Sequence, residues 1–208
     1  MNTNNKYVIT INRELGSGGR TVGRKLAEKL GVEYYDKAVI KALEERYNLS
    51  AEQIEHLKGQ ETGWWAEFKR KMTFSDSEYD LNQMGIETED VFRAETQILK
   101  ALAKEESCVI AGRSAFYIFR EHPNHLSVFI QASMPCRVAR VAREQNMSKE
   151  EARMTIEKID RMRENYVNEY TGTSRYDTRN YQLVLSMDEL DEDAAVNIIL
   201  GYIGSMTH

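Results

Sequence analysis

Proline, cysteine and long apolar runs are all scarce in this chain of 208 residues. The prolines are Pro123 and Pro135, so a proline ring can interrupt few helices. The cysteines, Cys108 and Cys136, show neither a second pair nor a C-x-x-C spacing, and we expect two reduced thiols in the core. No apolar run approaches the roughly 20 residues that span a bilayer, and the opening MNTNNK contains no apolar signal region. These absences predict a cytoplasmic protein without a membrane partner.

The charge argues against a further class of partner. The formal net charge of −5 disfavours binding to a nucleic acid polymer, which requires a basic surface. Small anionic ligands remain compatible, because basic residues outnumber acidic ones between positions 137 and 163. The four histidines show no metal-ligand spacing. His122 and His125 flank a turn, and we expect them to be exposed loop residues.

The segment 7–31 carries the clearest pattern in the sequence. A β-branched run at 8–11 leads into a glycine-rich cluster, and apolar residues at helical spacing follow until Gly31. This order predicts a strand, a tight loop and a helix. Backbone N–H groups can point inward at such a loop, and the helix N-terminus adds partial positive charge, so the loop is suited to holding a phosphate. The cluster consists of Gly16, Ser17, Gly18 and Gly19.

The loop does not match the strict phosphate-loop pattern G-x-x-x-x-G-K-[ST]. If Gly18 is the second glycine, the first falls on Arg13 and the lysine on Gly19. If the pattern slides by one residue, Arg20 replaces the lysine and Glu14 the first glycine. The lysine is absent in both registers. The alternative interpretation is a glycine-rich turn that only connects a strand to a helix.

The same segment resembles the opening of the cytidylate kinase family. Those enzymes begin with a strand that ends in Asp, followed by G-P-S-G-S-G-K-G-T and by a helix that ends L-A-x-x-L-G. Here Asn12 stands at the Asp, residues 16–18 at G-S-G, Thr21 at the final Thr and residues 26–31 at the helix end, without a gap. This register puts Gly19 at the lysine.

The loop R-E-x-G-S-G-G-R, followed by Y-Y-D-K at 34–37, is similar to the divergent branch called cytidylate kinase-like. The resemblance implies an α/β, three-layer P-loop NTPase fold with a five-stranded parallel sheet, helices on both faces and a helical lid. The alternation of strand and helix patterns along the chain agrees with such a sheet. The predicted strands are 7–11, 33–35, 108–111, 127–131 and 182–186, and the predicted helices are 36–47, 50–57, 88–104, 133–145, 148–166 and 191–203.

We expect residues 1–208 to form one kinase domain, because their number suits a single core. The resemblance implies a helical lid at 134–170 and an acceptor-side insertion at 58–88. In the insertion, Trp64 and Trp65 could stack with Phe68 on an acceptor base. We favour the alternative that they pack the insertion onto the body or onto a second copy of the chain, because tryptophan is a large apolar group. A monomer and a homodimer both remain open.

The resemblance implies that ATP is the donor, that the loop amides cradle its β- and γ-phosphates, and that Thr21 reaches Mg²⁺. A substitute for the lysine is then needed. We favour Arg20 over Arg13, because Arg20 lies on the first helical turn. The predicted cofactor-binding residues are Gly16, Ser17, Gly18, Gly19, Arg20, Thr21, Arg137 and Arg140.

Residues at two strand ends are expected on the acceptor side. Asp36 follows the second strand, where it could hold Mg²⁺, orient the acceptor or only cap the next helix. Arg113 follows the third strand, where cytidylate kinases read D-G-R-D, and its planar fork suits an acceptor phosphate. The alternative for Arg113 is a surface arginine. Ala111 and Ser114 replace both acids of that motif.

Arginines of the lid complete the predicted site. Such residues neutralise charge on a transferred phosphoryl group. Asp160, Arg161 and Arg163 resemble an arginine and aspartate run of the family, which implies Arg161 and Arg163 as catalytic cations. Arg20, chosen above for its place on the first helical turn, is the third predicted catalytic cation. The spacing of Arg137 and Arg140 is also compatible with a solvated helix face.

The sequence therefore predicts an ATP-dependent phosphotransferase that acts on a small phosphorylated acceptor, with CMP or dCMP as the leading candidate. Two alternatives remain. The absent lysine and the absent D-G-R-D acids suit a domain that binds a nucleotide without turnover. A non-nucleotide metabolite could also take the place of the acceptor nucleotide.

Overall fold

The computed structural model describes residues 1–36 and 89–206, and its centre is a five-stranded parallel sheet in the order β2-β3-β1-β4-β5. The parallel direction of every pair confirms the predicted sheet. β1 extends to Arg13 rather than Ile11, and β4 begins at His125 rather than Ser127. The strands are β1 (Val8–Arg13), β2 (Glu33–Tyr35), β3 (Cys108–Ala111), β4 (His125–Gln131) and β5 (Leu183–Ser186).

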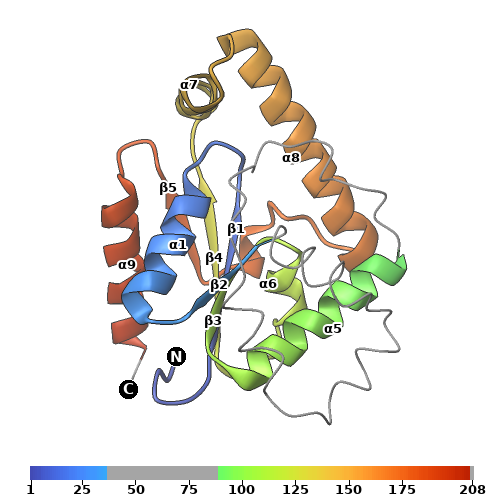
Figure 1. The fold of residues 1–208 in the computed structure, drawn as a ribbon, viewed down its shortest axis with the longest axis vertical. Coiled ribbons are helices and arrows are strands. Elements are labelled where there is room, and N and C mark those ends of the chain that lie inside the picture. The colour runs from blue at the N-terminus through green and yellow to red at the C-terminus, as the bar shows by residue number, and fades with distance from the viewer. Residues whose placement is uncertain (37–88, 207–208) are drawn as a thin grey trace, which may run out of the picture.

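Helices cover both faces of the sheet, and a helical hairpin projects beyond the carboxyl ends of the strands (Figure 1). α1 and α9 lie on one face, and α5 and the short α6 lie on the other. α7 and α8 form the hairpin, which lies in the segment predicted as the helical lid. The bounds are α1 (Gly19–Leu30), α5 (Glu89–Glu105), α6 (Ala115–Ile118), α7 (Met134–Gln145), α8 (Lys149–Thr171) and α9 (Glu192–Ser205), with a 3₁₀ turn, η3, at Thr178–Asn180.

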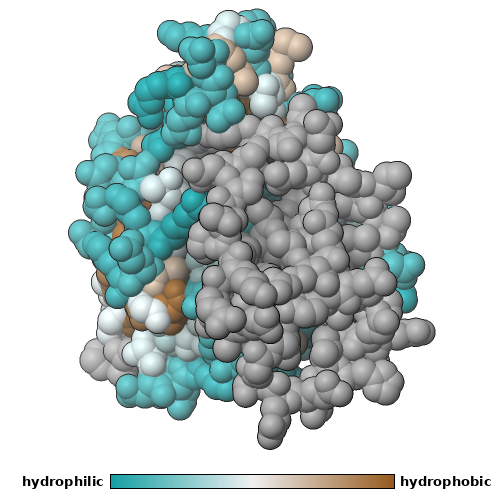
Figure 2. Space-filling view, viewed as in Figure 1, coloured by the Kyte–Doolittle hydropathy of each residue, from teal (hydrophilic) through white to brown (hydrophobic). Residues whose placement is uncertain are grey.

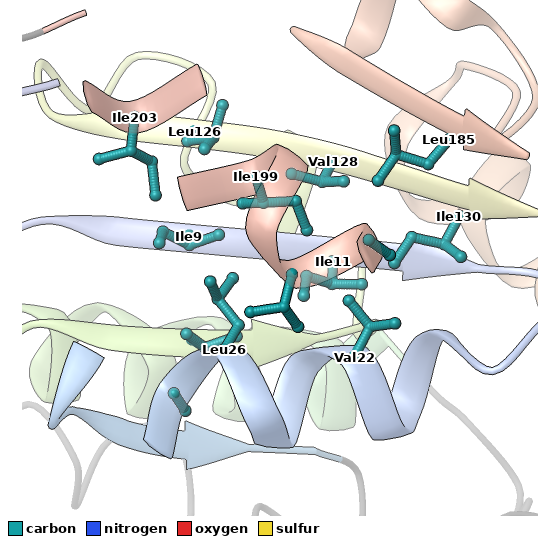
Figure 3. Close-up of a cluster of buried hydrophobic side chains, with 14 of the residues drawn as sticks. Ile9, Ile11, Val22, Leu26, Leu126, Val128, Ile130, Leu185, Ile199 and Ile203 are labelled. Atoms are coloured by element: carbon teal, nitrogen blue, oxygen red, sulfur yellow. The ribbon is translucent and has the colours of Figure 1, made fainter. Parts of the chain in front are cut away.

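The largest apolar core lies between the sheet and the layer of α1 and α9 (Figure 3). Side chains alternate along β1, so Ile9 and Ile11 face this core while Val8 belongs to the core under α5. The apolar stripe of α1, Val22 and Leu26, packs against the same side as Ile9 and Ile11. The remaining labelled members come from β4, β5 and α9: Leu126, Val128, Ile130, Leu185, Ile199 and Ile203.

Side chains cap two of the described helices at their N-termini. Ser148 and Glu151 form a capping box at α8, and Asp191 caps α9. Ser133 precedes α7, but its side chain makes no capping hydrogen bond to that helix. Instead the Ser133 amide donates to Oδ1 of Asp188 at 2.8 Å, and this bond lowers the pKa of the Asp188 carboxyl to about 2.

The predicted helices at 36–47 and 50–57 and the insertion at 58–88, with Trp64, Trp65 and Phe68, lie outside the described residues. Among the helices of the described ranges, none combines the length and the apolar character of a membrane span.

Burial corrects two predictions about side chains. Cys136 is exposed on α7 rather than in the core, whereas Cys108 is buried in β3, where burial raises the pKa of its thiol to about 12. His125 is not a loop residue, because it begins β4 and its Nε2 lies 2.8 Å from the Thr10 hydroxyl. Burial, followed by the nearby charge of His122, lowers the pKa of His125 to about 4.

His125 therefore predicts a pH-dependent stability. Its pKa is about 4 in the folded protein and 6.5 ordinarily, so the unfolded chain binds the extra proton between these values. Stability is fully present above pH 6.5 and falls as the pH drops through 4, with a loss of roughly 2 kcal/mol between pH 7 and pH 5. Denaturant titrations of wild type and His125→Gln check this. The variant should lose less stability on acidification, and identical pH profiles would contradict the assignment.

Candidate functional site

The glycine-rich loop between β1 and α1 forms the tight turn that the sequence predicts. Gly16 and Gly18 have φ angles of 78° and 85°, which are values that favour glycine. Ser17 is fully buried, and its amide and hydroxyl both donate to the Glu14 carbonyl, at 3.3 and 2.8 Å. Within the described residues, no hydrogen bond occupies the amides of Gly16, Gly18, Gly19 and Thr21. The loop and the first turn of α1 therefore present several N–H groups to a ligand.

The loop is packed directly against the lid hairpin. Leu15 is fully buried in an apolar cluster with residues of α7 and α8. A Cβ on Gly16 would lie 2.8 Å from Val141 Cγ2 and 3.0 Å from the Arg137 carbonyl oxygen, so only glycine allows this approach. The described base of the hairpin is thus part of the same packed unit as the loop.

A buried carboxylate on α8 strengthens this attachment. Asp160 accepts a hydrogen bond from the Leu15 amide at 3.1 Å and another from Nη1 of Arg137 at 2.5 Å. Nη1 of Arg137 also donates to the Leu15 carbonyl at 3.3 Å. Because both the amide and the carbonyl of Leu15 are hydrogen-bonded to the hairpin, the loop and the hairpin cannot separate without breaking buried polar contacts.

Further charges surround this junction. Arg175, which is 1% exposed, donates to the Arg13 carbonyl and approaches Asp160 at 3.5 Å. Arg163 lies 3.5 Å from the same Arg13 carbonyl. Glu14 faces Arg137 at 3.6 Å, yet burial outweighs that attraction and raises the pKa of its carboxyl. Arginines outnumber carboxylates among the described residues of this junction, so the net charge near the loop is positive.

Two residues predicted for catalysis and metal binding are brought together at the end of β2. Arg20 pairs with Asp36, with its Nη2 3.2 Å from Oδ2 and its Nε 3.3 Å from the same oxygen. Both side chains are largely buried. Thr21 is exposed on the first turn of α1. In the described ranges, no group of three or more metal-ligating side chains forms a ready metal site.

The predicted lid arginines occupy different environments. The guanidinium of Arg140 lies 3.0 Å from the place of a Cβ on Gly18 and bonds Glu192 at 2.5 Å, so it borders the loop. Arg137 and Arg163 lie at the loop junction described above. Arg161 is exposed on α8. The described surface of the hairpin in Figure 2 is predominantly hydrophilic, which agrees with a solvated outer face.

Arg113 lies at the carboxyl end of β3 with a φ of 55°. Its side chain is 6% exposed and forms an ion pair with Glu95 of α5. Nη2 also donates to the Tyr166 hydroxyl at 3.2 Å, and the guanidinium carbon lies 4.9 Å from the Tyr166 ring centroid. Tyr166 in turn donates to Glu95 at 3.0 Å. Arg113 is therefore held in a buried triad rather than on the surface.

Sequence reasoning did not single out Glu95 or Arg175. Glu95 had a detectable signal, because it lies at helical spacing from buried apolar residues of its own helix. A carboxylate on an apolar stripe requires a partner. Arg175 gave no comparable signal, because it stands in the irregular segment between α8 and η3. Its side chain contacts Asn12 and Arg13, which are more than 140 positions away in sequence.

The chain belongs to the cytidylate kinase-like family, whose model matches residues 8–189. Among curated proteins it is 23% identical to a cytidylate kinase of Saccharolobus islandicus, over 96% of this chain and 92% of that protein. It is also 23% identical to a cytidylate kinase of Methanopyrus kandleri, over 92% and 90% of the two chains. These matches support a kinase that acts on a nucleotide or small molecule.

Solved structures confirm the fold. An uncharacterized protein from Eubacterium ventriosum superposes with a TM-score of 0.71 at 26% identity and covers 96% of this chain and 99% of its own. A shikimate kinase from Bacteroides thetaiotaomicron superposes with a TM-score of 0.51 at 16% identity and covers 95% and 98% of the two chains. The protein therefore has the predicted three-layer P-loop NTPase fold with a helical lid.

The junction at Asp160 generates a stability prediction. Asp160→Asn keeps an oxygen that can accept from Leu15 but leaves Arg137 and Arg175 without their carboxylate. Uncompensated buried charge should lower the free energy of unfolding by about 3–5 kcal/mol, measured by denaturant titration.

Glu157→Gln is the matched control, since it removes an exposed ion pair with Arg153 from the same helix. It should cost no more than about 1 kcal/mol. Equal losses for the two variants would show that Asp160 contributes only as a surface charge does.

Proposed function

We propose that this protein transfers the γ-phosphoryl group of ATP to a small phosphorylated acceptor, with a nucleoside monophosphate such as CMP or dCMP as the acceptor class. The observation that carries the proposal is the position of two features on neighbouring strands. The glycine-rich loop follows β1 and Arg113 follows β3, and these strands pair in parallel with Ile11 opposite Ala111. An anion on the loop and an anion at Arg113 would therefore meet at one edge of the sheet.

The loop supports the donor half of the reaction. The amides of Gly18, Gly19 and Thr21 and the N-terminus of α1 suit the phosphates of ATP. When bound, Mg²⁺ would neutralise charge on the phosphates. The Thr21 hydroxyl and the Asp36 carboxylate are the oxygen ligands that would hold it, and Asp36 would have to share its carboxylate with Arg20.

The triad at Arg113 supports the acceptor half. Glu95 and Tyr166 fix the guanidinium, so its orientation is set before a ligand arrives. A planar guanidinium can bind two oxygens of an acceptor phosphate. The names of the curated relatives, cytidylate kinase, favour CMP or dCMP over other acceptors.

Two alternatives to a nucleotide acceptor also have support. Glu95 already lies against Arg113, so an acceptor phosphate must share the guanidinium with a carboxylate. A non-nucleotide acceptor that needs less positive charge is therefore the second candidate. A domain that binds nucleotide without turnover is the third, because the loop carries glycine at the lysine position.

A nucleotide panel tests the proposal. Thermal-shift measurements with ATP, CMP, dCMP and other nucleotides, with and without Mg²⁺, should reveal stabilisation by ATP and by one acceptor. A γ-phosphoryl transfer assay should then show product with that pair. Stabilisation without transfer would favour the binding domain, and transfer only to a non-nucleotide would favour the second candidate.

Gly18→Val tests the loop. Valine at a φ of 85° is strained, and its Cβ would lie 3.0 Å from Arg140 Nη1. We expect the variant to lose stabilisation by ATP while retaining a cooperative thermal transition. Gly31→Ala is the control, because Gly31 also has a positive φ but, among the described residues, no neighbour within 4 Å of its Cβ position. Full stabilisation of Gly18→Val by ATP would place the donor site elsewhere.

Arg113→Lys tests the acceptor assignment. Lysine keeps the charge beside Glu95 but loses the paired hydrogen-bond geometry. We expect the KM for the acceptor to rise by about tenfold or more while the KM for ATP changes little, because one charged hydrogen bond is lost at the acceptor alone. Equal increases for both substrates in steady-state kinetics would assign Arg113 to the fold or to the donor site.

A further inference from the structure

We infer that Arg13 supplies the positive charge that the lysine supplies in the strict phosphate-loop pattern. Positions 13 and 19 have then exchanged roles, because the cation stands at position 13 and the glycine at position 19. The inference rests on the proposed function, because it concerns the donor phosphates. Position 19 carries glycine where the strict pattern carries lysine, and position 13 carries arginine where that pattern carries its first glycine.

The geometry at Gly19 supports the exchange. A Cβ built on Gly19 would lie 2.6 Å from Cβ and 3.0 Å from Cγ of Arg13, which is closer than two carbon atoms can pack. The first carbons of Arg13 thus fill the space that a side chain at position 19 would enter. Gly19 carries no positive φ in this structure, so the close approach of Arg13, rather than backbone conformation, requires glycine there.

The far end of the same side chain reaches the next strand. A Cβ on Gly112 would lie 2.5 Å from Nη1 of Arg13. Gly112 follows β3 and directly precedes Arg113. The Arg13 side chain therefore runs from the first residue of α1 to the turn after β3, across the carboxyl ends of two adjacent strands. That path places its guanidinium beside Gly112, the residue that precedes Arg113.

The backbone of Arg13 is fixed before any ligand binds. Its amide donates to Oδ1 of Asn12 at 2.9 Å, and its carbonyl accepts from Arg175 and, at 3.5 Å, from Arg163. The residue as a whole is 8% exposed. A cation held in this way can stabilise charge on transferred phosphoryl oxygens without reorganisation. Arg20, the residue favoured from sequence, is instead directed to Asp36 at the end of β2.

A double-mutant cycle tests the geometry without a ligand. Gly19→Ala in the wild-type background should lower Tm by roughly 3–10 °C, because the new methyl group collides with Arg13. In an Arg13→Gly background, which removes both the Cβ and the Cγ of residue 13, the same substitution should leave Tm unchanged or raise it, since alanine is otherwise favoured over glycine in a helix. Equal Tm changes in both backgrounds would overturn the exchange.

Binding of inorganic tripolyphosphate tests the charge without an acceptor. Isothermal titration should show an affinity at least about tenfold lower for Arg13→Ala than for wild type. Arg179→Ala is the control, because Arg179 is an exposed arginine that pairs with Asp177. It should bind tripolyphosphate like wild type. Unchanged affinity in Arg13→Ala, or no binding to the wild type, would overturn the inference.

Rescue connects the inference to turnover. In the transfer assay, Arg13→Gly should lower kcat by about 10²–10³-fold, and Arg13→Gly/Gly19→Lys should recover most of that loss. Recovery would support an exchange of roles, and a double variant as inactive as Arg13→Gly would contradict it. If tripolyphosphate binding depends on Arg13 but no acceptor is phosphorylated, the proposed kinase function fails while the role of Arg13 in binding phosphate stands.

Discussion

The hydrogen bonds of Asp160 hold the candidate site together. This one carboxylate binds the amide of Leu15 in the loop and the guanidinium of Arg137 on α7, while its own helix, α8, forms the other half of the lid. A buried carboxylate that neutralises several arginines is costly to disrupt, because each freed charge would remain desolvated. The loop, α7 and the base of α8 therefore behave as one packed unit.

This attachment shapes the electrostatics of the site. With Leu15 buried in the hairpin, the backbone of Arg13 is fixed and its side chain is directed across Gly19 toward Gly112. α8 also carries Tyr166, which accepts a hydrogen bond from Arg113, so a single helix contacts both the glycine-rich loop and Arg113. The positive charge near the loop is supplied by arginines from β1, α7, α8 and the segment after α8. Such charge is preorganised rather than brought in by closure.

Much of this architecture could be predicted from local sequence. The β-branched run, the glycine cluster and the capping residue Ser148 each specify structure within a few positions, and the sheet, α1 and the capping box agree with them. The partners of Asp160, Arg113 and Arg13 could not be predicted, because they join residues far apart in sequence. The preference for Arg20 over Arg13 considered only distance along the helix, whereas the structure adds Asp36 as a partner for Arg20. Gly19 is a second example. The sequence attributes this glycine to the loop, whereas in the structure the close approach of Arg13 is what requires glycine at this position.

Hydrogen exchange at the Leu15 amide tests the central claim most directly. If Asp160 fixes the loop to the lid hairpin, this amide should be protected in the ligand-free protein about as strongly as the amides of the core strands. Adding ATP and Mg²⁺ should change its protection little. A Leu15 amide that exchanges as fast as an exposed loop in the free protein, and becomes protected only with nucleotide, would contradict a preassembled loop.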